Sequence, residues 1–176
     1  MEPTRLPVPQ PSRLPAPELV LLPLSDLLPA GEQVVLHEPS GILIHVARCV
    51  DAQRDHPVLH VQQLTPSELT VFRPLVDNVP DFCPYEVLLA HFSYHRVTEQ
   101  VIERMRRRWY AAQEEGVADS VLRPVRNVLS RVRLKVQELG LDVVSLLDLG
   151  YQLLPLTRRR RRSRGPRQEQ DEREEE

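Results

Sequence analysis

The hydrophobic positions of residues 32–63 fall into three short runs separated by turn-forming residues. The runs are Val34–Leu36, Ile42–Val46 and Val58–Val61. Short runs that are rich in β-branched residues and bounded by turns indicate strands, so the pattern predicts a small antiparallel sheet. Residues 1–31 hold eight of the 17 prolines and have no helical period. They predict an arm without regular structure.

The segment that follows the third run carries the signature of a helix start. The hydroxyl of Thr65 can accept a hydrogen bond from the first turn, and the carboxylate of Glu68 can reach back to the Thr65 amide. Pro66 fits the first helical position, where no N–H donor is needed. A helix is therefore predicted from Pro66, and Pro74 is expected to kink or shorten it.

Hydrophobic residues at helical spacing predict three more helices, and a final pair of short runs predicts a hairpin. One helix is predicted from Pro84 and one over residues 95–115. A third opens within residues 119–124 and runs to Leu139, where the following glycine stops it. Residues 143–154 predict two strands joined by a turn. The order is thus sheet, capped helix, three further helices and hairpin.

Composition and charge narrow the class of protein. The 176 residues are 41% hydrophobic, enough for one core, and the formal net charge is −2. Two cysteines cannot form a disulfide scaffold, and no apolar run approaches the ~18 residues of a membrane span. A cytoplasmic protein without a signal peptide is therefore expected. Residues 96–135 hold ten basic and five acidic side chains, and this local excess suits a polyanionic partner.

Two motifs lie at the ends of the helical region. Leu64-Thr65-Pro66-Ser67-Glu68 opens the first helix, and Gly150-Tyr151-Gln152-Leu153 closes the hairpin. With the elements between them, they resemble the winged helix-turn-helix DNA-binding domain of OmpR/PhoB-type response regulators. The resemblance implies an α+β fold over residues 32–156, with an N-terminal antiparallel sheet, a recognition helix and a C-terminal β-hairpin wing.

The chain departs from that family in three places. Residues 93–119 insert an extra helix between the second helix and the recognition helix. The wing carries Leu147-Asp148 where the family usually has Arg-Gly, so a DNA contact from the wing tip is not implied. The 31 residues before the sheet are too few for a receiver domain, and phosphorylation by a partner kinase is therefore not implied.

The resemblance implies that the helix 122–139 enters the major groove of double-stranded DNA. Arginine, asparagine and glutamine can pair with base edges there, and flanking cations contact phosphates. The candidate groove residues are Arg123, Arg126, Asn127, Ser130, Arg131, Arg133 and Gln137. The candidate phosphate contacts are Arg106, Arg107 and Arg108 in the inserted helix and Arg158, Arg159 and Arg160 in the tail.

Two segments leave alternatives open. The inserted helix either extends the phosphate footprint, forms a dimer surface, or packs on the domain through Val101, Met105 and Trp109. The tail, residues 157–176, is arginine-rich and then acidic, a composition typical of disorder. Its arginines would clamp phosphates unless its acidic end folds back on them.

The primary hypothesis is a bacterial DNA-binding transcription regulator associated with the nucleoid, with RNA polymerase or a second copy as a further partner. The alternative is a protein-interaction or structural module that keeps the fold without reading DNA. The wing residues and the net charge of −4 before the tail favour this alternative. No glycine-rich phosphate loop or nucleophile–base set occurs, and His91 and His95 lack the remainder of a metal site. No enzyme activity, cofactor, metal or small-molecule substrate is predicted.

Overall fold

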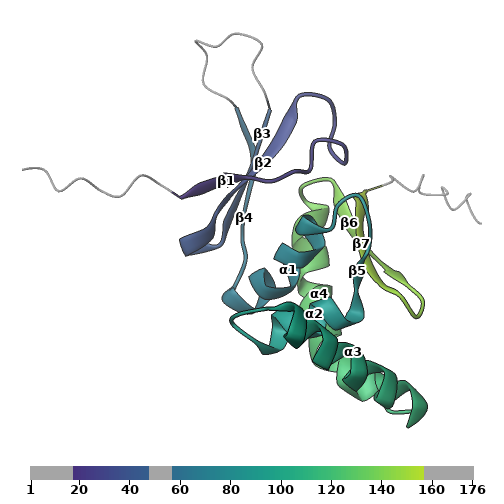
Figure 1. Ribbon diagram of the computed structural model, residues 1–176. Coiled ribbons are helices and arrows are strands. Elements are labelled where there is room, and N and C mark those ends of the chain that lie inside the picture. The colour runs from purple at the N-terminus through teal and green to yellow at the C-terminus, as the bar shows by residue number, and fades with distance from the viewer. Residues whose placement is uncertain (1–17, 48–56, 157–176) are drawn as a thin grey trace, which may run out of the picture.

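The larger of two antiparallel sheets lies at one end of the molecule. The computed structural model describes residues 18–47 and 57–156, which form an α+β fold with four α-helices and two antiparallel sheets (Figure 1). The larger sheet has the strand order β1-β2-β3-β4. Its strands are β1 (Leu19–Leu21), β2 (Glu32–His37), β3 (Ile42–Ala47) and β4 (Val58–Gln63), with a 3₁₀ turn η1 (Glu38–Ser40) between β2 and β3. The antiparallel sheet predicted from the three hydrophobic runs is confirmed.

The structure moves the boundary of the N-terminal arm. Residues 18–31 were expected to lack regular structure, but β1 pairs with β2, and Leu22, Leu24 and Leu28 are buried. The reason is that Pro23 and Pro29 follow the strand and need no place in its ladder, while the leucines around them enter the core. The remaining part of the predicted arm, residues 1–17, lies outside the described residues, as does the tail 157–176.

The predicted capping box is present at the start of α1 (Pro66–Asp77). The amide of Thr65 donates to Oε2 of Glu68 at 2.8 Å, and the amide of Glu68 donates to Oγ1 of Thr65 at 3.4 Å. The helix continues through the buried Pro74 to Asp77, so Pro74 does not end it. Asn78 caps the last turn by donating from Nδ2 to the carbonyl oxygen of Pro74 at 2.7 Å.

The inserted helix α3 (Glu99–Glu114) packs on the domain. It lies against α2 (Tyr85–Ser93) at the end of the molecule opposite the larger sheet (Figure 1). The rings of Trp109 and Tyr85 lie 4.8 Å apart between centroids, and Met105 is buried beside them. The helix begins after Thr98, which caps it, rather than at residue 95. Of the three interpretations of the insert, packing is therefore present.

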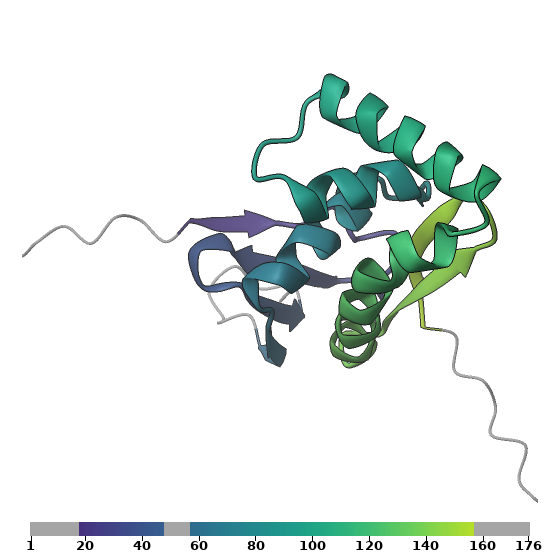
Figure 2. The same cartoon turned by 90° about the horizontal axis from the view of Figure 1, so that it is seen from below.

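The last helix and the hairpin lie side by side. Helix α4 (Ala118–Gln137) runs through Pro124 and buries a stripe of aliphatic residues, and β6 (Leu141–Leu146) follows after Gly140. Strand β7 (Gly150–Pro155) pairs with β6 on one side and with the short β5 (Cys83–Pro84) on the other. Figure 2 shows α4 next to this three-stranded sheet. None of the helices described is both long and apolar enough to cross a bilayer.

Candidate nucleic-acid interface

The exposed side of α4 carries the predicted groove residues. The opposite side is buried through Leu122, Val125, Leu129, Val132 and Val136, so the helix presents one fixed polar face to solvent. Six of the seven predicted residues are exposed, and Gln137 is half-buried. The exposed ones are Arg123, Arg126, Asn127, Ser130, Arg131 and Arg133.

The first two arginines of this face share one acidic partner. Nη2 of Arg123 lies 3.6 Å from Asp119, and Nη1 of Arg126 is also paired with Asp119. Ser130 donates from its hydroxyl to the carbonyl oxygen of Arg126 at 2.9 Å, which fixes its side chain against the helix. The side-chain amide of Asn127 makes no hydrogen bond within the described residues. It remains available to an external partner.

The last two predicted residues both contact the following strand. Arg133 donates to Asp142 through Nε at 2.6 Å and through Nη2 at 2.9 Å, a bidentate pair. Gln137 donates from Nε2 to the same carboxylate at 3.0 Å. The bonds from Arg133 and Gln137 lower the pKa of Asp142, although its burial opposes this. Arg133 and Gln137 therefore connect α4 to β6, and a base contact would have to compete with these bonds.

A buried carboxylate lies behind the C-terminal part of α4. Glu68 has an exposed fraction of 1%, and it pairs with Lys135 at 2.7 Å and with Nε of Arg131 at 3.4 Å. Burial alone would raise the pKa of Glu68, but the hydrogen bonds from Lys135 and Thr65 and the charge of Lys135 lower it. Arg131 is thus positioned by α1, while half of its side chain stays in solvent.

One residue of the exposed face, Leu134, is not among the predicted groove residues. Leu134 is 66% exposed and follows Asn127 by two helical turns, so both lie on the same side of α4. It is the one large apolar side chain on the exposed face of α4 as the structure describes it. Helical periodicity could have predicted this exposure. Positions 132 and 136 are buried, and position 134, two residues from each, lies on the opposite side of the helix. An exposed aliphatic group in a polar face can contact the methyl group of thymine.

The arginines of α3 differ in their ion pairs and in their exposure to solvent. Arg106 pairs with Glu86 of α2 at 3.2 Å and with Glu103 at 2.8 Å, so it belongs to the α2–α3 contact. Arg107 pairs with Glu103 at 3.0 Å but is largely exposed. Arg108 is exposed and has no ion pair among the described residues. The predicted phosphate contacts Arg158, Arg159 and Arg160 lie outside those residues.

The tip of the β6–β7 hairpin is apolar. Leu147 is 85% exposed and Leu149 is 52% exposed, and Asp148 between them has a left-handed backbone with φ 61°. Aspartate tolerates this conformation better than most residues, which explains its place in the turn. The tip therefore offers two leucines and a carboxylate, and no cation.

His91 and His95, the two histidines weighed as metal ligands, line one pocket at the C-terminal end of α2. His95 lies beyond the end of α2, so it does not share a helix turn with His91. Cys83 is buried, and its burial, together with the charges of Glu86 and Asp77, raises its pKa to about 12. Within residues 18–47 and 57–156, no group of three histidine, cysteine or acidic side chains is arranged to hold a metal ion.

Comparison of the chain with models of protein families, with curated proteins and with solved structures found no match.

Proposed function

We propose that the protein is a DNA-binding transcription regulator with a winged helix-turn-helix domain, which reads the major groove with α4. The observation that carries the proposal is the outward face of α4. Asn127, the exposed part of Arg131 and Leu134 lie on one side of a helix whose other side is buried. Amide, guanidinium and aliphatic groups are the ones that distinguish adenine, guanine and thymine at their major-groove edges.

The surrounding elements support a rigid presentation of this face. The capping box of α1 holds Glu68, which in turn holds Lys135 and Arg131 of α4. In the same C-terminal part of α4, Asp142 of β6 holds Arg133 and Gln137. A recognition helix needs such support because its side chains must meet base edges without first being ordered. The hairpin that follows α4 takes the place of the wing.

The ion pairs and hydrogen bonds divide the seven candidate residues into three groups. Arg133 and Gln137 are engaged by Asp142, and Ser130 is bonded to the helix backbone. We assign base reading to Asn127, Arg131 and Arg126, of which Arg126 must exchange Asp119 for a base or a phosphate. Arg123 and Arg108 are exposed cations suited to phosphates.

The test is binding of duplex DNA, measured by fluorescence anisotropy over a salt series. The full chain is compared with Asn127→Ala and Arg131→Ala, using fragments selected for tight binding and a random duplex. Each base-reading residue should contribute about 1–3 kcal/mol for the selected fragments and much less for the random one. Arg96→Ala, an exposed arginine before α3, is the matched control and should change neither.

The hairpin tip favours a second candidate, a protein-interaction module. Its two exposed leucines and its carboxylate suit a protein surface better than a phosphate backbone. The same titration separates the two functions. If no duplex is preferred at any salt concentration, and Asn127→Ala and Arg131→Ala bind as the unchanged chain does, the DNA-binding proposal is wrong.

A further inference from the structure

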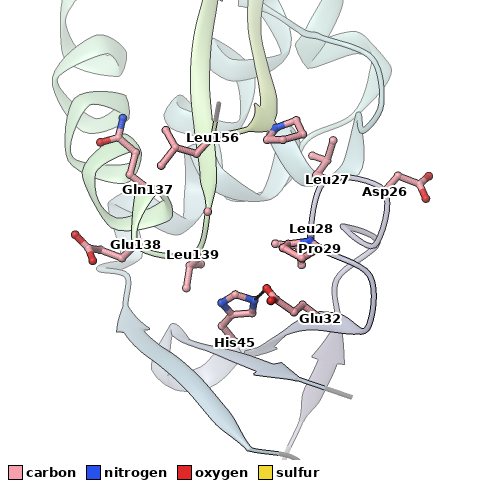
Figure 3. Close-up of a pocket in the computed structure, with 12 residues that line it drawn as sticks. Asp26, Leu27, Leu28, Pro29, Glu32, His45, Gln137, Glu138, Leu139 and Leu156 are labelled. Atoms are coloured by element: carbon pink, nitrogen blue, oxygen red, sulfur yellow. Dashed lines mark ion pairs between the residues drawn. The ribbon is translucent and has the colours of Figure 1, made fainter. Parts of the chain in front are cut away.

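A cavity lies between the larger sheet and the C-terminal ends of α4 and β7. Figure 3 shows His45 and Glu32 at its floor, with Leu28, Leu139 and Leu156 around them. Its volume is about 670 Å³, and it is open to solvent. Pockets that hold small molecules have volumes of about 300–1,000 Å³ and combine apolar walls with a few polar groups. The cavity has both properties.

The polar floor is a buried histidine beside a carboxylate. His45 is only 6% exposed, and its side chain extends from β3 toward the cavity (Figure 3). Its Nε2 lies 2.8 Å from Oε2 of Glu32, which is close enough for an ion pair. The contact is not aligned as a hydrogen bond, so Nε2 has no hydrogen-bond partner within the described residues. Such a buried polar atom usually has a partner in proteins.

Apart from His45, the ionisable side chains that line the cavity are acidic. Glu32 lies at the floor, and Asp26 and Glu138 lie at opposite edges (Figure 3). No lysine or arginine is among the described residues that line it. A concave site with carboxylates and low-dielectric walls concentrates a negative potential, which attracts cations. The contact with His45 leaves acceptor capacity on Glu32, because a carboxylate has about four lone-pair positions.

We propose that this cavity is a binding site for an organic cation, a guanidinium or alkylammonium group on a short apolar stem. The cationic group would bind Glu32 beside His45, and the stem would lie against Leu28, Leu139 and Leu156. This inference does not depend on DNA binding, although the site includes Glu138 next to the C-terminal end of α4. Two sources of the same chemistry are available: a free ligand, and the run Arg158–Arg162, which begins two residues after Leu156.

The experiment uses n-butylguanidinium as the probe and its uncharged isostere n-butylurea as the control ligand. Both are titrated at neutral pH into the full-length, ¹⁵N-labelled chain, and the backbone amide shifts are followed by NMR. The guanidinium should give saturable shifts centred on residues 26–32, 45, 138–140 and 156. The urea should bind at least about tenfold more weakly, because a charged hydrogen bond contributes about 1.5–3 kcal/mol.

Variants of the three carboxylates identify which of them bind the cation. Glu32→Gln should weaken binding of the guanidinium by about tenfold. The edge variants Asp26→Asn and Glu138→Gln should weaken it by smaller factors, because the side chains of Asp26 and Glu138 are exposed. The edge variants keep the test valid if Glu32→Gln unfolds the chain by leaving His45 without its neighbour. Glu114→Gln, an exposed carboxylate on α3, is the matched control and should have no effect.

A full-length variant with Arg158–Arg162 replaced by glutamine separates the two sources. Equal binding of the probe in both chains supports a free ligand. Tighter binding in the glutamine variant, with shifts of the cavity amides on substitution alone, supports the chain's own arginines as the occupant. If butylguanidinium shifts no cavity amide in either chain, or shifts them no more than butylurea does, the proposal is overturned.

Discussion

Nζ of Lys135 on α4 lies 2.7 Å from Oε2 of Glu68, the same carboxylate oxygen that accepts the Thr65 amide in the capping box of α1. Lys135 also donates to the carbonyl oxygen of Gln63 at 2.7 Å. One side chain therefore ties the last helix to the end of β4 and to the start of the first helix. Lys135 is the only lysine of the chain.

Lys135→Met should lower the free energy of unfolding by about 1.5–3 kcal/mol at neutral pH, because it leaves a buried carboxylate without its main cation. Arg131 and the Thr65 amide still contact Glu68, so the loss stays below that of a fully unpaired charge. Urea unfolding followed by circular dichroism measures it. Arg104→Met, at an exposed position on α3, should change stability by less than about 0.5 kcal/mol.

The same pair predicts how stability depends on pH. The native pKa of Glu68 is below its ordinary value of 4.5, so the ionised form contributes stability above pH 4.5. That contribution is lost as the pH falls from 4.5 through the lowered native pKa. Lys135→Met removes the main group that lowers this pKa, so the variant should lose less stability over the same interval. The free energy of unfolding is measured between pH 6 and pH 3 for the unchanged chain and for Lys135→Met. Parallel curves of this free energy against pH would contradict this account.

Arg133 and Arg126 should respond differently to alanine substitution. Arg133→Ala removes the bidentate pair with Asp142 and should lower stability by about 0.5–1 kcal/mol, with little effect on discrimination between duplexes. Arg126→Ala should leave stability nearly unchanged and weaken DNA binding. The comparison needs unfolding and anisotropy measurements on both variants. The reverse result, with Arg133→Ala abolishing preference, would move base reading to the C-terminal end of α4.

Trp109 is the main anchor of the inserted helix. It is 5% exposed and stacks at a tilt on Tyr85 of α2, so Trp109→Ala should lower stability by about 3–5 kcal/mol. Tyr110→Ala changes the neighbouring exposed ring and should lower it by less than about 0.5 kcal/mol. Chemical denaturation measures both. Equal effects would mean that α3 is not held through its apolar face.

Gly41 and Gly31 form a matched pair with different surroundings. Both have a positive φ, 68° and 85°, so alanine is strained at either position by about 1–2 kcal/mol. A Cβ at Gly31 would meet open space, whereas a Cβ at Gly41 would lie 2.3 Å from the carbonyl oxygen of Leu64. Gly41→Ala must therefore separate the β2–β3 turn from the start of α1. Its thermal midpoint should be clearly lower than that of Gly31→Ala.

Local patterns were enough to find most of the elements. The capping box at Thr65 and Glu68 acts between neighbouring residues, and the aliphatic stripe of α4 follows from helical periodicity, so both could be predicted without a fold. The α+β class follows from the same signals. Strand β1 was missed because its leucines stand among prolines, and only pairing with β2 makes that segment a strand.

The sequence by itself determined which face of α4 is polar, because burial of the opposite stripe depends only on spacing along one helix. Only the tertiary structure decided which of those polar side chains are free. Glu68 reaches Lys135 and Arg131 from α1, and Asp142 takes Arg133 and Gln137 after a chain reversal. The cavity between β3, the loop before β2 and the end of α4 is likewise a product of packing. Contacts that depend on a chain reversal, or on segments distant along the chain, leave no periodic signal, and therefore they cannot be derived from helical spacing alone.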